Sequence, residues 1–471
     1  MKPLIILSLA MLLPSCAVVG PDYIVAVTAV PAARNSAQPG TASMAYELSG
    51  WWTRLNDPLL SQLIERALAG NLNLREAQGR VLEARARRGF AQADRFPTLS
   101  ASSGADRLRH SNEVGARSAS ELYSAGFDAS WELDLFGGRQ RAVEAADALL
   151  QSAEEDRRDV LVSMAAECAI NYVEMRSFQE RLGIALANLA AQGDTFDIAG
   201  WRFDAGLVTQ LDVDQARTAL EQTRSQLPAL RTGLDQAKNR LAILLGEKPG
   251  SLEELLAQSA PVPTPPEAIA TGVPADLLRR RPDIRRAERR LAAQTAQIGV
   301  ATAALYPRLT LVGSIGLESL AASRLFTSAA GTTNAAANAA WTLFDAGRVR
   351  HNIAVQGALQ EQALARYEAA ILGALADVEN ALVAYAGERQ RRDALTAASV
   401  SAASALQIAR DQYAAGLTDF LVVLETQRTL LALQDQRAAS NGEATSDVVR
   451  LFKALGGGWR ENAEPTGGLR Q

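Results

Sequence analysis

Residue types that carry out chemistry are scarce in this chain of 471 residues, which has two histidines, His110 and His351, and two cysteines, Cys16 and Cys168. The histidines are 241 positions apart, and no HxxH, GxSxG, CxxC or P-loop pattern brings a nucleophile, a base or metal ligands together. Two cysteines also provide no zinc knuckle and no disulfide framework. We therefore expect no enzyme activity, no metal site and no cofactor.

Cys16 is the cysteine whose surroundings form a pattern. An apolar run over residues 4–13 follows Lys2, and Ser15 directly precedes Cys16. Ten apolar residues are too few to span a bilayer as a helix. The pattern resembles the bacterial lipobox, in which a signal peptide, here residues 1–15, is removed and the cysteine is acylated. The alternative is an ordinary signal peptide with a chance cysteine. Ala17, in place of an aspartate, is compatible with sorting to the outer membrane.

The composition narrows the class of protein. Hydrophobic residues make up 48% of the chain, aromatic residues 5%, and the formal net charge is −4. This combination argues against disorder, and nothing is basic enough to indicate a nucleic-acid partner. Alanine and leucine supply most of the apolar residues, which favours closely packed helices. No window after the leader reaches about 18 apolar residues, so we expect no transmembrane helix.

The chain matches itself when it is shifted by 210 residues. The matched pairs include Phe96-Pro97 with Tyr306-Pro307, Trp131 with Trp341, Leu211 with Leu421, and Leu241 with Leu451. A period this long is not that of a solenoid repeat, so we predict the duplication of a domain-sized module. We place a signal peptide at 1–15, a lipidated segment at 16–55, repeat 1 at 56–250, a Pro-rich linker at 251–273, repeat 2 at 274–460 and a tail at 461–471.

Each repeat contains a stretch whose polarity alternates with a period of two. From Tyr123 to Leu135, apolar and polar residues alternate over 13 positions, which is long enough for a transmembrane strand of about 9–11 residues. Residues 98–108 are the expected partner strand, and residues 309–317 and 337–343 repeat the arrangement. A soluble surface hairpin would show the same periodicity, so that alternative stays open.

The period then changes to heptads. Residues 161–175 carry apolar side chains at a 4-3-4-3 spacing, and residues 371–385 repeat it. Such seams are typical of coiled coils, and Cys168 on the first seam is interpreted as a buried structural thiol. Residues 139–200 contain no proline, so a helix there would be roughly 90 Å long. Pro228 interrupts a later seam and predicts a kink.

Counting strands constrains the assembly. Open sheet edges are not tolerated in the hydrocarbon region, so strands that span a membrane close into a barrel. Four strands per chain are too few, because a membrane barrel needs at least about eight. The chain must therefore share its barrel with copies of itself, and the strand count alone leaves two copies with 8 strands and three copies with 12 both open.

Several motifs together resemble the outer-membrane factor family of bacterial tripartite efflux pumps, the TolC-like, NodT-type lipoproteins. The segment Gly20-Pro21-Asp22-Tyr23 resembles the family's mature start, and residues 273–288 resemble its most recognisable central motif. The segments 131–137 and 341–347 resemble the ends of its transmembrane strands, and 413–417 and 453–459 complete the set.

This resemblance implies a homotrimer, a 12-stranded transmembrane β-barrel with four strands per chain, and a long periplasmic α-helical barrel. It implies an outer-membrane, lipid-anchored exit duct that passively conducts drugs or other small toxic compounds. The implied partners are a periplasmic adaptor protein and an inner-membrane transporter of the resistance-nodulation-division class. A duct for type I protein secretion and a coiled-coil lipoprotein without a pore remain the alternatives.

The resemblance also assigns pore residues. The periplasmic tip that meets the adaptor would contain Gly206, Leu207, Gly416 and Leu417, and glycine suits such turns because it tolerates positive φ. The periplasmic gate would be an apolar ring of Leu421 and an acidic ring of Glu425, with Val422 where some relatives have a second acid. In repeat 1, the acids after the equivalent turn are Asp212 and Asp214. The polar strand positions Asp128, Glu132 and Asp134 would line the barrel lumen or else face solvent at its rim. A solvated helix face is the alternative for the gate residues.

Overall fold

The computed structural model describes residues 18–24, 48–109, 113, 119–265 and 280–459. Cys16, the predicted signal peptide and the predicted tail at 461–471 lie outside the described residues. Its contacts divide the chain into two compact units. Unit 1 takes residues 79–155 and 285–369 with the N-terminal 28, and unit 2 takes 29–78, 156–284 and 370–471. Each unit therefore draws segments from both predicted repeats.

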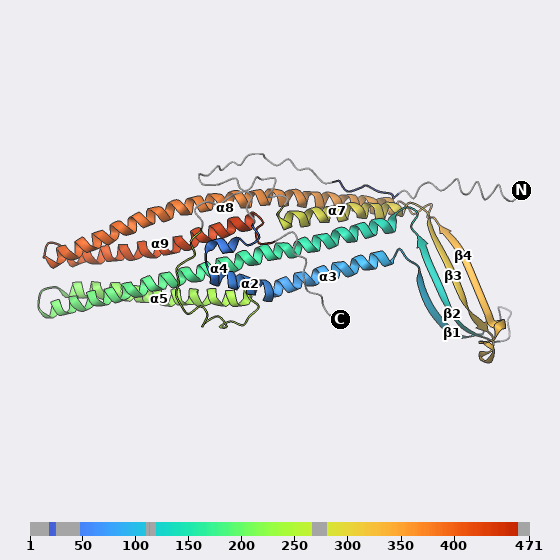
Figure 1. Cartoon of the computed structure of the whole chain (residues 1–471), viewed down its shortest axis with the longest axis horizontal. Helices are drawn as coiled ribbons and strands as arrows, with labels where there is room; N and C mark the ends of the chain where they lie inside the picture. The colour runs from blue at the N-terminus through green and yellow to red at the C-terminus, as the bar shows by residue number, and fades with distance from the viewer. Residues whose placement is uncertain (1–17, 25–47, 110–112, 114–118, 266–279, 460–471) are drawn as a thin grey trace. The chain divides into compact units, whose positions relative to one another are not determined.

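Unit 1 contains one antiparallel sheet of four strands in the order β1-β2-β3-β4 (Figure 1). The strands are β1 (Thr98–Leu108), β2 (Ser120–Leu133), β3 (Arg308–Ser319) and β4 (Gly331–Ala340). The prediction of four strands per chain is confirmed, and β1 has the expected bounds. β4 ends at Ala340, so Trp341 and Leu343 lie beyond the strand in which the alternation placed them.

The long helices of the two repeats have the same lengths. They are η1 (Trp51–Leu55), α2 (Pro58–Gly70), α3 (Leu72–Ala93), α4 (Gly138–Asp204), α5 (Gln210–Leu244), α7 (Pro282–Ala303), α8 (Arg348–Ala414) and α9 (Phe420–Ala454), with short 3-10 turns η2 (Ala322–Arg324) and η3 (Ser328–Ala330) between β3 and β4. α4 and α8 each have 67 residues and start 210 positions apart, so each is roughly 100 Å long. α5 and α9 each have 35 residues, and α5 continues through Pro228.

The break between α2 and α3 lies at Asn71. The Asn71 side chain accepts a hydrogen bond from the Leu74 amide at 3.1 Å and donates one to the Leu244 carbonyl oxygen at 2.7 Å. An asparagine that satisfies the first amides of a helix marks its N-terminus. Asn71 therefore starts α3 and also joins it to the end of α5.

The main core of unit 2 forms around η1, α2 and the middle of α4. The indole of Trp51 is fully buried and stacks on Phe452 with ring centroids 5.2 Å apart. Cys168 is also fully buried in this core, and burial raises the pKa of its thiol to about 12. Since the thiolate is the reactive form, the interpretation of Cys168 as a structural thiol is confirmed.

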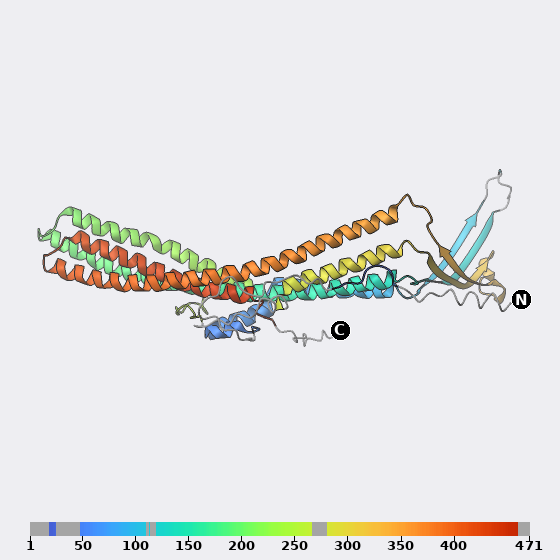
Figure 2. The same ribbon diagram turned by 90° about the horizontal axis from the view of Figure 1, so that it is seen from above.

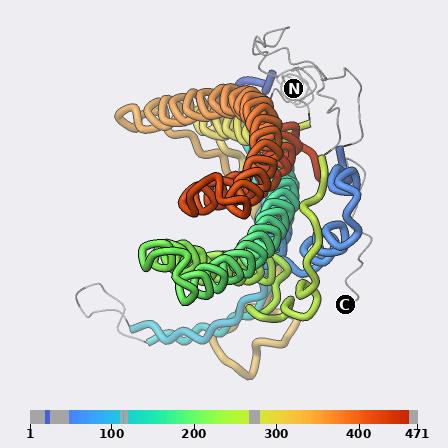
Figure 3. The backbone as a smooth tube through the Cα atoms, turned by 90° about the vertical axis from the view of Figure 1, so that its left-hand side faces the viewer, coloured from blue at the N-terminus to red at the C-terminus, as the bar shows by residue number. Residues whose placement is uncertain are grey.

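Two helical hairpins, α4–α5 and α8–α9, form the rest of unit 2, and Figure 2 and Figure 3 show them next to each other. Inside the first hairpin, Ala185, Leu227 and Leu230 form a buried cluster. Inside the second, the buried cluster contains Leu406, Val423 and Leu430. The heptad seams predicted from the sequence thus hold each hairpin together.

One described helix, α8, contains an 18-residue window that is apolar enough to cross a membrane by length and composition. Its mean hydropathy is 1.4, and 28% of the window is buried. This window departs from the sequence expectation, because closely spaced alanines raise the mean hydropathy without an unbroken apolar run. A helix of roughly 100 Å is about three times as long as the hydrocarbon core of a bilayer. Core helices of soluble proteins have the same composition.

Candidate functional site

The register of the sheet places Phe127, Trp131 and Ile315 on one face, whereas Leu108, Leu122 and Val312 lie on the other. Phe127 of β2 lies opposite Ala101 of β1 and Ile315 of β3, and Trp131 lies opposite Leu311. Because side chains alternate between the two faces of a strand, this face continues into β4 as Ala335, Ala337 and Ala339, whereas Thr333 lies opposite Ile315. Phe127 is 55% exposed and Ile315 is 62% exposed. The face is therefore an uncovered apolar surface.

The opposite face of the sheet is polar at the same levels. Asp128 lies opposite Ser100 and Ser314, and Ser314 lies opposite Asn334. Gly126 and Gly316 face each other on this side, and a Cβ atom added to Gly126 would lie 3.0 Å from the Gly316 Cα atom. Glycine in a strand allows such a close backbone approach. One sheet thus carries a membrane-compatible face and a water-compatible face.

The three acids predicted to line the lumen have different surroundings. The Asp128 carboxylate is exposed on the polar face and accepts a hydrogen bond from the Ser102 hydroxyl at 2.9 Å. The Glu132 carboxylate forms an ion pair with Arg139 at 3.0 Å. Asp134 lies one residue past the end of β2, and its carboxylate accepts a hydrogen bond from the Gln140 amide in the first turn of α4 at 2.7 Å. Asp134 therefore caps the start of α4.

The strand ends repeat the same contact in both halves. The Trp131 indole donates to the Arg95 carbonyl oxygen at 2.9 Å, and the Trp341 indole donates to the Leu305 carbonyl oxygen at 3.0 Å. The donor and the acceptor of the second contact each lie 210 residues after those of the first. Tryptophan, with an apolar ring and a single polar N–H, is typical of membrane–water interfaces. This end of the sheet therefore has the residues expected at one surface of a bilayer.

The N-terminal segment 18–24 docks at this end of the sheet on α4 and α7. Arg141 is 4% exposed, and its guanidinium donates to the Val19 carbonyl oxygen at 3.1 Å and to the Asp22 carboxylate at 2.7 Å. The backbone at Gly20 crosses α7 so closely that an added Cβ atom would lie 2.4 Å from the Gly299 Cα atom. Glycine at position 20 permits this approach, and a Cβ atom added to Gly299 would instead lie 2.7 Å from the Arg141 Cγ atom.

Tyr23 completes the docking of this segment. Its hydroxyl donates to the Glu288 carboxylate at 3.2 Å, and the Arg289 guanidinium lies 5.6 Å from its ring centroid. Burial and then the Glu288 charge raise the pKa of Tyr23 to about 12. The two segments with the strongest family resemblance, 20–23 and 273–288, thus contact each other through Tyr23 and Glu288.

In unit 2, the two tip turns have the same backbone geometry. Gly206 has a φ of 70° and Gly416 a φ of 72°. The Leu207 amide donates to the Arg202 carbonyl oxygen at 2.8 Å, and the Leu417 amide donates to the Gln412 carbonyl oxygen at 2.9 Å. A left-handed glycine with this hydrogen bond is the Schellman ending of a helix.

The residues around these turns place a large apolar surface at the tips. Leu207 is 71% exposed and Leu417 is 77% exposed. Both leucines are therefore largely open to solvent.

The predicted gate residues lie on one exposed face at the start of α9. Leu421 is 49% exposed, whereas Phe420 and Leu424 beside it are buried. The Glu425 carboxylate forms an ion pair with Arg428 at 2.8 Å, and both side chains are more than half exposed. Any acidic ring at this position would therefore carry an equal number of arginines one helical turn away.

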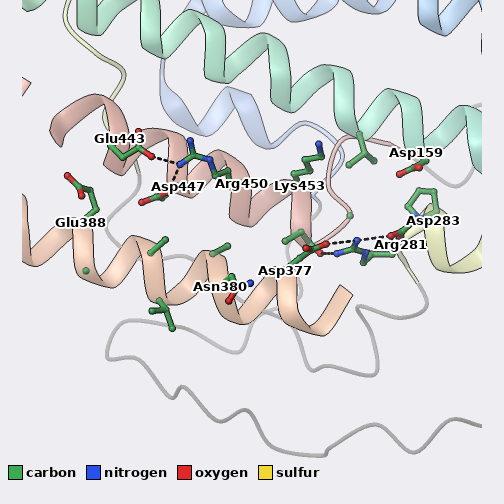
Figure 4. Close-up of a pocket in the computed structure, with 18 of the residues that line it drawn as sticks. Asp159, Arg281, Asp283, Asp377, Asn380, Glu388, Glu443, Asp447, Arg450 and Lys453 are labelled. Carbon is green, nitrogen blue, oxygen red and sulfur yellow. Dashed lines mark hydrogen bonds and ion pairs between the residues drawn. The ribbon is translucent and has the colours of Figure 1, made fainter. Parts of the chain in front are cut away.

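A cavity of about 870 Å³ lies between α8, α9, the start of α7 and α4 (Figure 4). Two arginines each join two carboxylates there: Arg450 contacts Glu443 and Asp447 at 2.6 Å each, and Arg281 contacts Asp283 at 2.7 Å and Asp377 at 3.0 Å. Burial raises the pKa of Asp447. The Arg281 ion pairs tie the start of α7 to α8, whereas the Arg450 ion pairs lie within α9. Among the residues that the structure describes, no group of His, Cys, Asp and Glu is placed to hold a metal ion.

The sequence was compared with known proteins. The model of the outer membrane efflux protein family matches residues 63–247 and 273–457. The chain belongs to the outer membrane efflux protein family. The double match confirms the duplication, and this family of channels accounts for a sheet with one apolar and one polar face. It also places the chain in the outer membrane as an efflux channel.

Relatives in this family cover nearly the whole chain. The pyoverdine export outer membrane protein OpmQ of Pseudomonas putida is 36% identical over 90% of this chain and 92% of its own length. The probable outer membrane lipoprotein SilC of Salmonella typhimurium is 32% identical over 97% of this chain and 99% of its own length. The solved outer-membrane channel OprN superimposes with a TM-score of 0.89 and 38% identity, covering 94% of this chain and all of that one.

Several residues that matter in this structure gave no clear signal in the sequence of this efflux protein. Arg141 is one arginine among many, and only the docked segment 18–24 explains its burial. Asp212 is one of the two acids that the first repeat offers just after its tip turn. Its carboxylate accepts a hydrogen bond from the Thr209 amide at 2.8 Å in a capping box at the start of α5. The spacing Thr-x-x-Asp could have shown this, because it resembles the capping-box pattern.

Proposed function

We propose that three copies of this chain form the exit duct of a tripartite efflux system and passively conduct small toxic compounds out of the cell. The carrying observation is the sheet: its apolar face is continuous over four strands, and within the described residues its outer edges, on β1 and β4, pair with no further strand. A lipid-exposed edge is not tolerated. Three copies would pair β4 of one chain with β1 of the next and close 12 strands.

The remaining assignments belong to the same proposal. Cys16 carries the lipid, which agrees with the name of SilC as a probable outer membrane lipoprotein. The tip residues Gly206, Leu207, Gly416 and Leu417 contact a periplasmic adaptor, which in turn docks on an inner-membrane transporter of the resistance-nodulation-division class. Leu421 and Glu425 form the gate. We also propose that the chain consists of the two repeats that the sequence predicts, residues 56–250 and 274–460.

The name of the relative OpmQ, a pyoverdine export outer membrane protein, supports the proposal that this duct conducts small compounds. Conduction needs no bond to be made or broken, so we assign the chain no catalytic residue and no cofactor. Asp128 is the lumen acid with the strongest case, because Glu132 has an arginine partner and Asp134 caps α4.

The first experiment measures the detergent-corrected mass of the protein purified from outer membranes. We expect three chains of 50.2 kDa less the leader, hence about 150 kDa in total. A monomer that is extracted without detergent once Cys16 is changed to alanine would contradict the barrel and favour a coiled-coil lipoprotein.

A matched pair of substitutions tests which face meets lipid. Phe127→Arg places a charge on the apolar face, where it costs about 2–4 kcal/mol at the bilayer midplane, so we expect loss of the membrane-inserted trimer. Asn334→Arg places the same side chain on the polar face, and we expect normal assembly. Equal assembly of both variants, scored by heat-resistant trimer on gels, would contradict the assignment of the faces.

A further inference from the structure

A cavity of about 480 Å³, distinct from the one in Figure 4, lies on the sheet between β2 and β3. Its large lining side chains are Phe127, Ile315 and Leu317, and the register places all three on the apolar face. The small side chains of Ala101 and Ala125 line it on the same face. The cavity is therefore an apolar depression in which small side chains lie among large ones.

The lining of this apolar depression indicates the chemistry of its ligand. Among the described residues, none that lines it carries a charge. Its volume is within the range of ligand-binding cavities, about 300–1,000 Å³. In the proposed barrel it would open to the hydrocarbon of the bilayer, where close packing rather than removal from water stabilises a contact. A hydrocarbon chain fits this lining, whereas a phosphate group would find no cation there.

The depth of the apolar depression follows from its position on β2. Phe127 and Ala125 lie four and six residues from Trp131, which is about 13–20 Å along a strand. With strands tilted by about 35–45°, this corresponds to a depth of about 10–15 Å. One leaflet of the hydrocarbon core is about 15 Å thick. The depression therefore lies within the leaflet that begins at the Trp131 end of the sheet.

The N-terminal segment 18–24 docks at the Trp131 end of the same two strands. The Val19 amide donates to the Phe136 carbonyl oxygen at 3.1 Å, three residues beyond the end of β2. A Cβ atom added to Gly137 would lie 2.8 Å from the Val18 Cα atom. The segment therefore starts at the connection from β2 to α4.

The same segment also crosses α7, which leads into β3 (Figure 1). Gly20 meets Gly299 at this crossing. Cys16 precedes Val18 by two residues, so its Cα atom is within about 8 Å of the Val18 Cα atom. A lipid on Cys16 would therefore enter the bilayer at the ends of β2 and β3.

The duplication provides an internal comparison. The shift of 210 residues relates β2 to β4 and β1 to β3, so the corresponding strand pair in the proposed trimer is β4 of one chain with β1 of the next. At that joint, Ala337 stands in place of Phe127 and Ala105 in place of Ile315. The large side chains that enclose the depression are therefore specific to β2 and β3, the pair at which segment 18–24 docks.

We propose that the apolar depression between β2 and β3 binds an acyl chain carried by Cys16 and so holds the lipid anchor against the barrel. This inference rests on the proposed function, to which both the barrel and the lipid on Cys16 belong. A chain tethered at the ends of these strands has already lost the freedom that a free phospholipid must lose on binding. It fills a depression whose lining would otherwise lack contacts.

Photo-cross-linking tests this occupant in the full-length protein. The photoreactive residue p-benzoylphenylalanine replaces either Phe127 or Ala337, which is the equivalent position on the same face. Outer membranes are irradiated, and the purified protein is digested and analysed by mass spectrometry. We expect at least about tenfold more adduct with the acylated N-terminal peptide from position 127, because the tether favours the adjacent site. Equal yields, or adducts of position 127 with free phospholipid alone, would overturn the proposal.

A second pair of variants fills the apolar depression. Ala125→Phe places a ring among its lining side chains, and Ala335→Phe makes the same change at the equivalent position of β4. With the cross-linker at position 127, we expect Ala125→Phe to abolish the adduct with the N-terminal peptide and Ala335→Phe to retain it. An adduct that persists in Ala125→Phe would also overturn the proposal.

The mass of the mature wild-type protein separates this inference from the proposed function. A Cys16 without acyl chains, or a protein that is monomeric in detergent, would contradict the proposed function itself. An acylated trimer that gives no anchor adduct at position 127 would overturn only the binding of the acyl chain in the depression.

Discussion

The two tip turns share a backbone and differ in the side chains that follow it. Both glycines adopt a φ near 70°, and both turns end a 67-residue helix. After the first turn, Thr209 and Asp212 form a capping box that satisfies the first amides of α5. After the second, Asp419 makes no side-chain capping bond, and Val422 occupies the position equivalent to Asp212.

This difference shows how duplication separates roles. The first copy uses its acid to fix a helix start, whereas the second copy leaves the start of α9, next to Leu421 and Glu425, without that cap. A helix start with fewer satisfied amides frays more easily. The less restrained copy is also the one that the proposed gate occupies.

The largest effect should come from the shared feature. Gly206→Val and Gly416→Val each force a left-handed backbone on a β-branched residue, and we expect each to lower the free energy of unfolding by about 1–2 kcal/mol. An added Cβ atom meets no other atom within 4 Å at either position, so the two costs should be equal. Urea unfolding of the tip, followed by circular dichroism, measures them. Unequal costs would show that one turn depends on contacts beyond its backbone.

The capping box should produce the next largest effect. Thr209→Ala and Asp212→Ala each remove a hydrogen bond at the start of α5, so we expect a loss of about 1 kcal/mol. Asp419→Ala at the equivalent position of the second turn removes no capping bond, and we expect a change within about 0.5 kcal/mol. Hydrogen exchange of the first-turn amides of α5 and α9 reports both. A comparable loss from Asp419→Ala would refute the contrast between the two copies.

A converse substitution restores an acid to the second copy. Val422→Glu places a carboxylate in the first turn of α9, where the helix dipole favours negative charge by about 0.3–1 kcal/mol. In the proposed gate it would also add a second acidic ring, so the reversal potential in a salt gradient should shift toward cation preference. Val422→Gln provides the uncharged control. No shift in reversal potential would place Val422 away from the conducting path.

The smallest effect on stability should come from the exposed pair of Glu425 and Arg428. Pairs this exposed contribute at most about 1 kcal/mol, so Glu425→Gln and Arg428→Gln should unfold nearly as wild type does. Their ion preferences should move in opposite directions, with Glu425→Gln weakening cation preference and Arg428→Gln strengthening it. Bilayer recordings under a salt gradient distinguish them, and equal shifts would remove both residues from the gate.

The sequence predicted the elements of this fold well because their periodicities are long and local. β1 was placed at 98–108, as found, and the shift of 210 residues relates α4 to α8 and α5 to α9. The alternation over 123–135 failed only at its end, since Asp134 caps a helix whose start no strand pattern reveals.

Tertiary contacts were harder to predict. Arg141 binds residues about 120 positions earlier, and nothing near it in the sequence marks that partner. Gln192 and Gln427 occupy positions that a heptad analysis assigns to the core. Among the described residues, the Gln192 side-chain oxygen and both polar atoms of the Gln427 amide have no hydrogen-bond partner, which is visible only in three dimensions.

The docked segment 18–24 has a consequence for the order in which the molecule is made. Tyr23 bonds to Glu288, 265 residues later in the chain, and Gly20 crosses Gly299. A ribosome adding about 5–20 residues per second synthesises Glu288 and Gly299 well after the N-terminus has emerged. The start of the chain must therefore remain undocked until α7 exists, and its docking reports that the second half has folded onto the first.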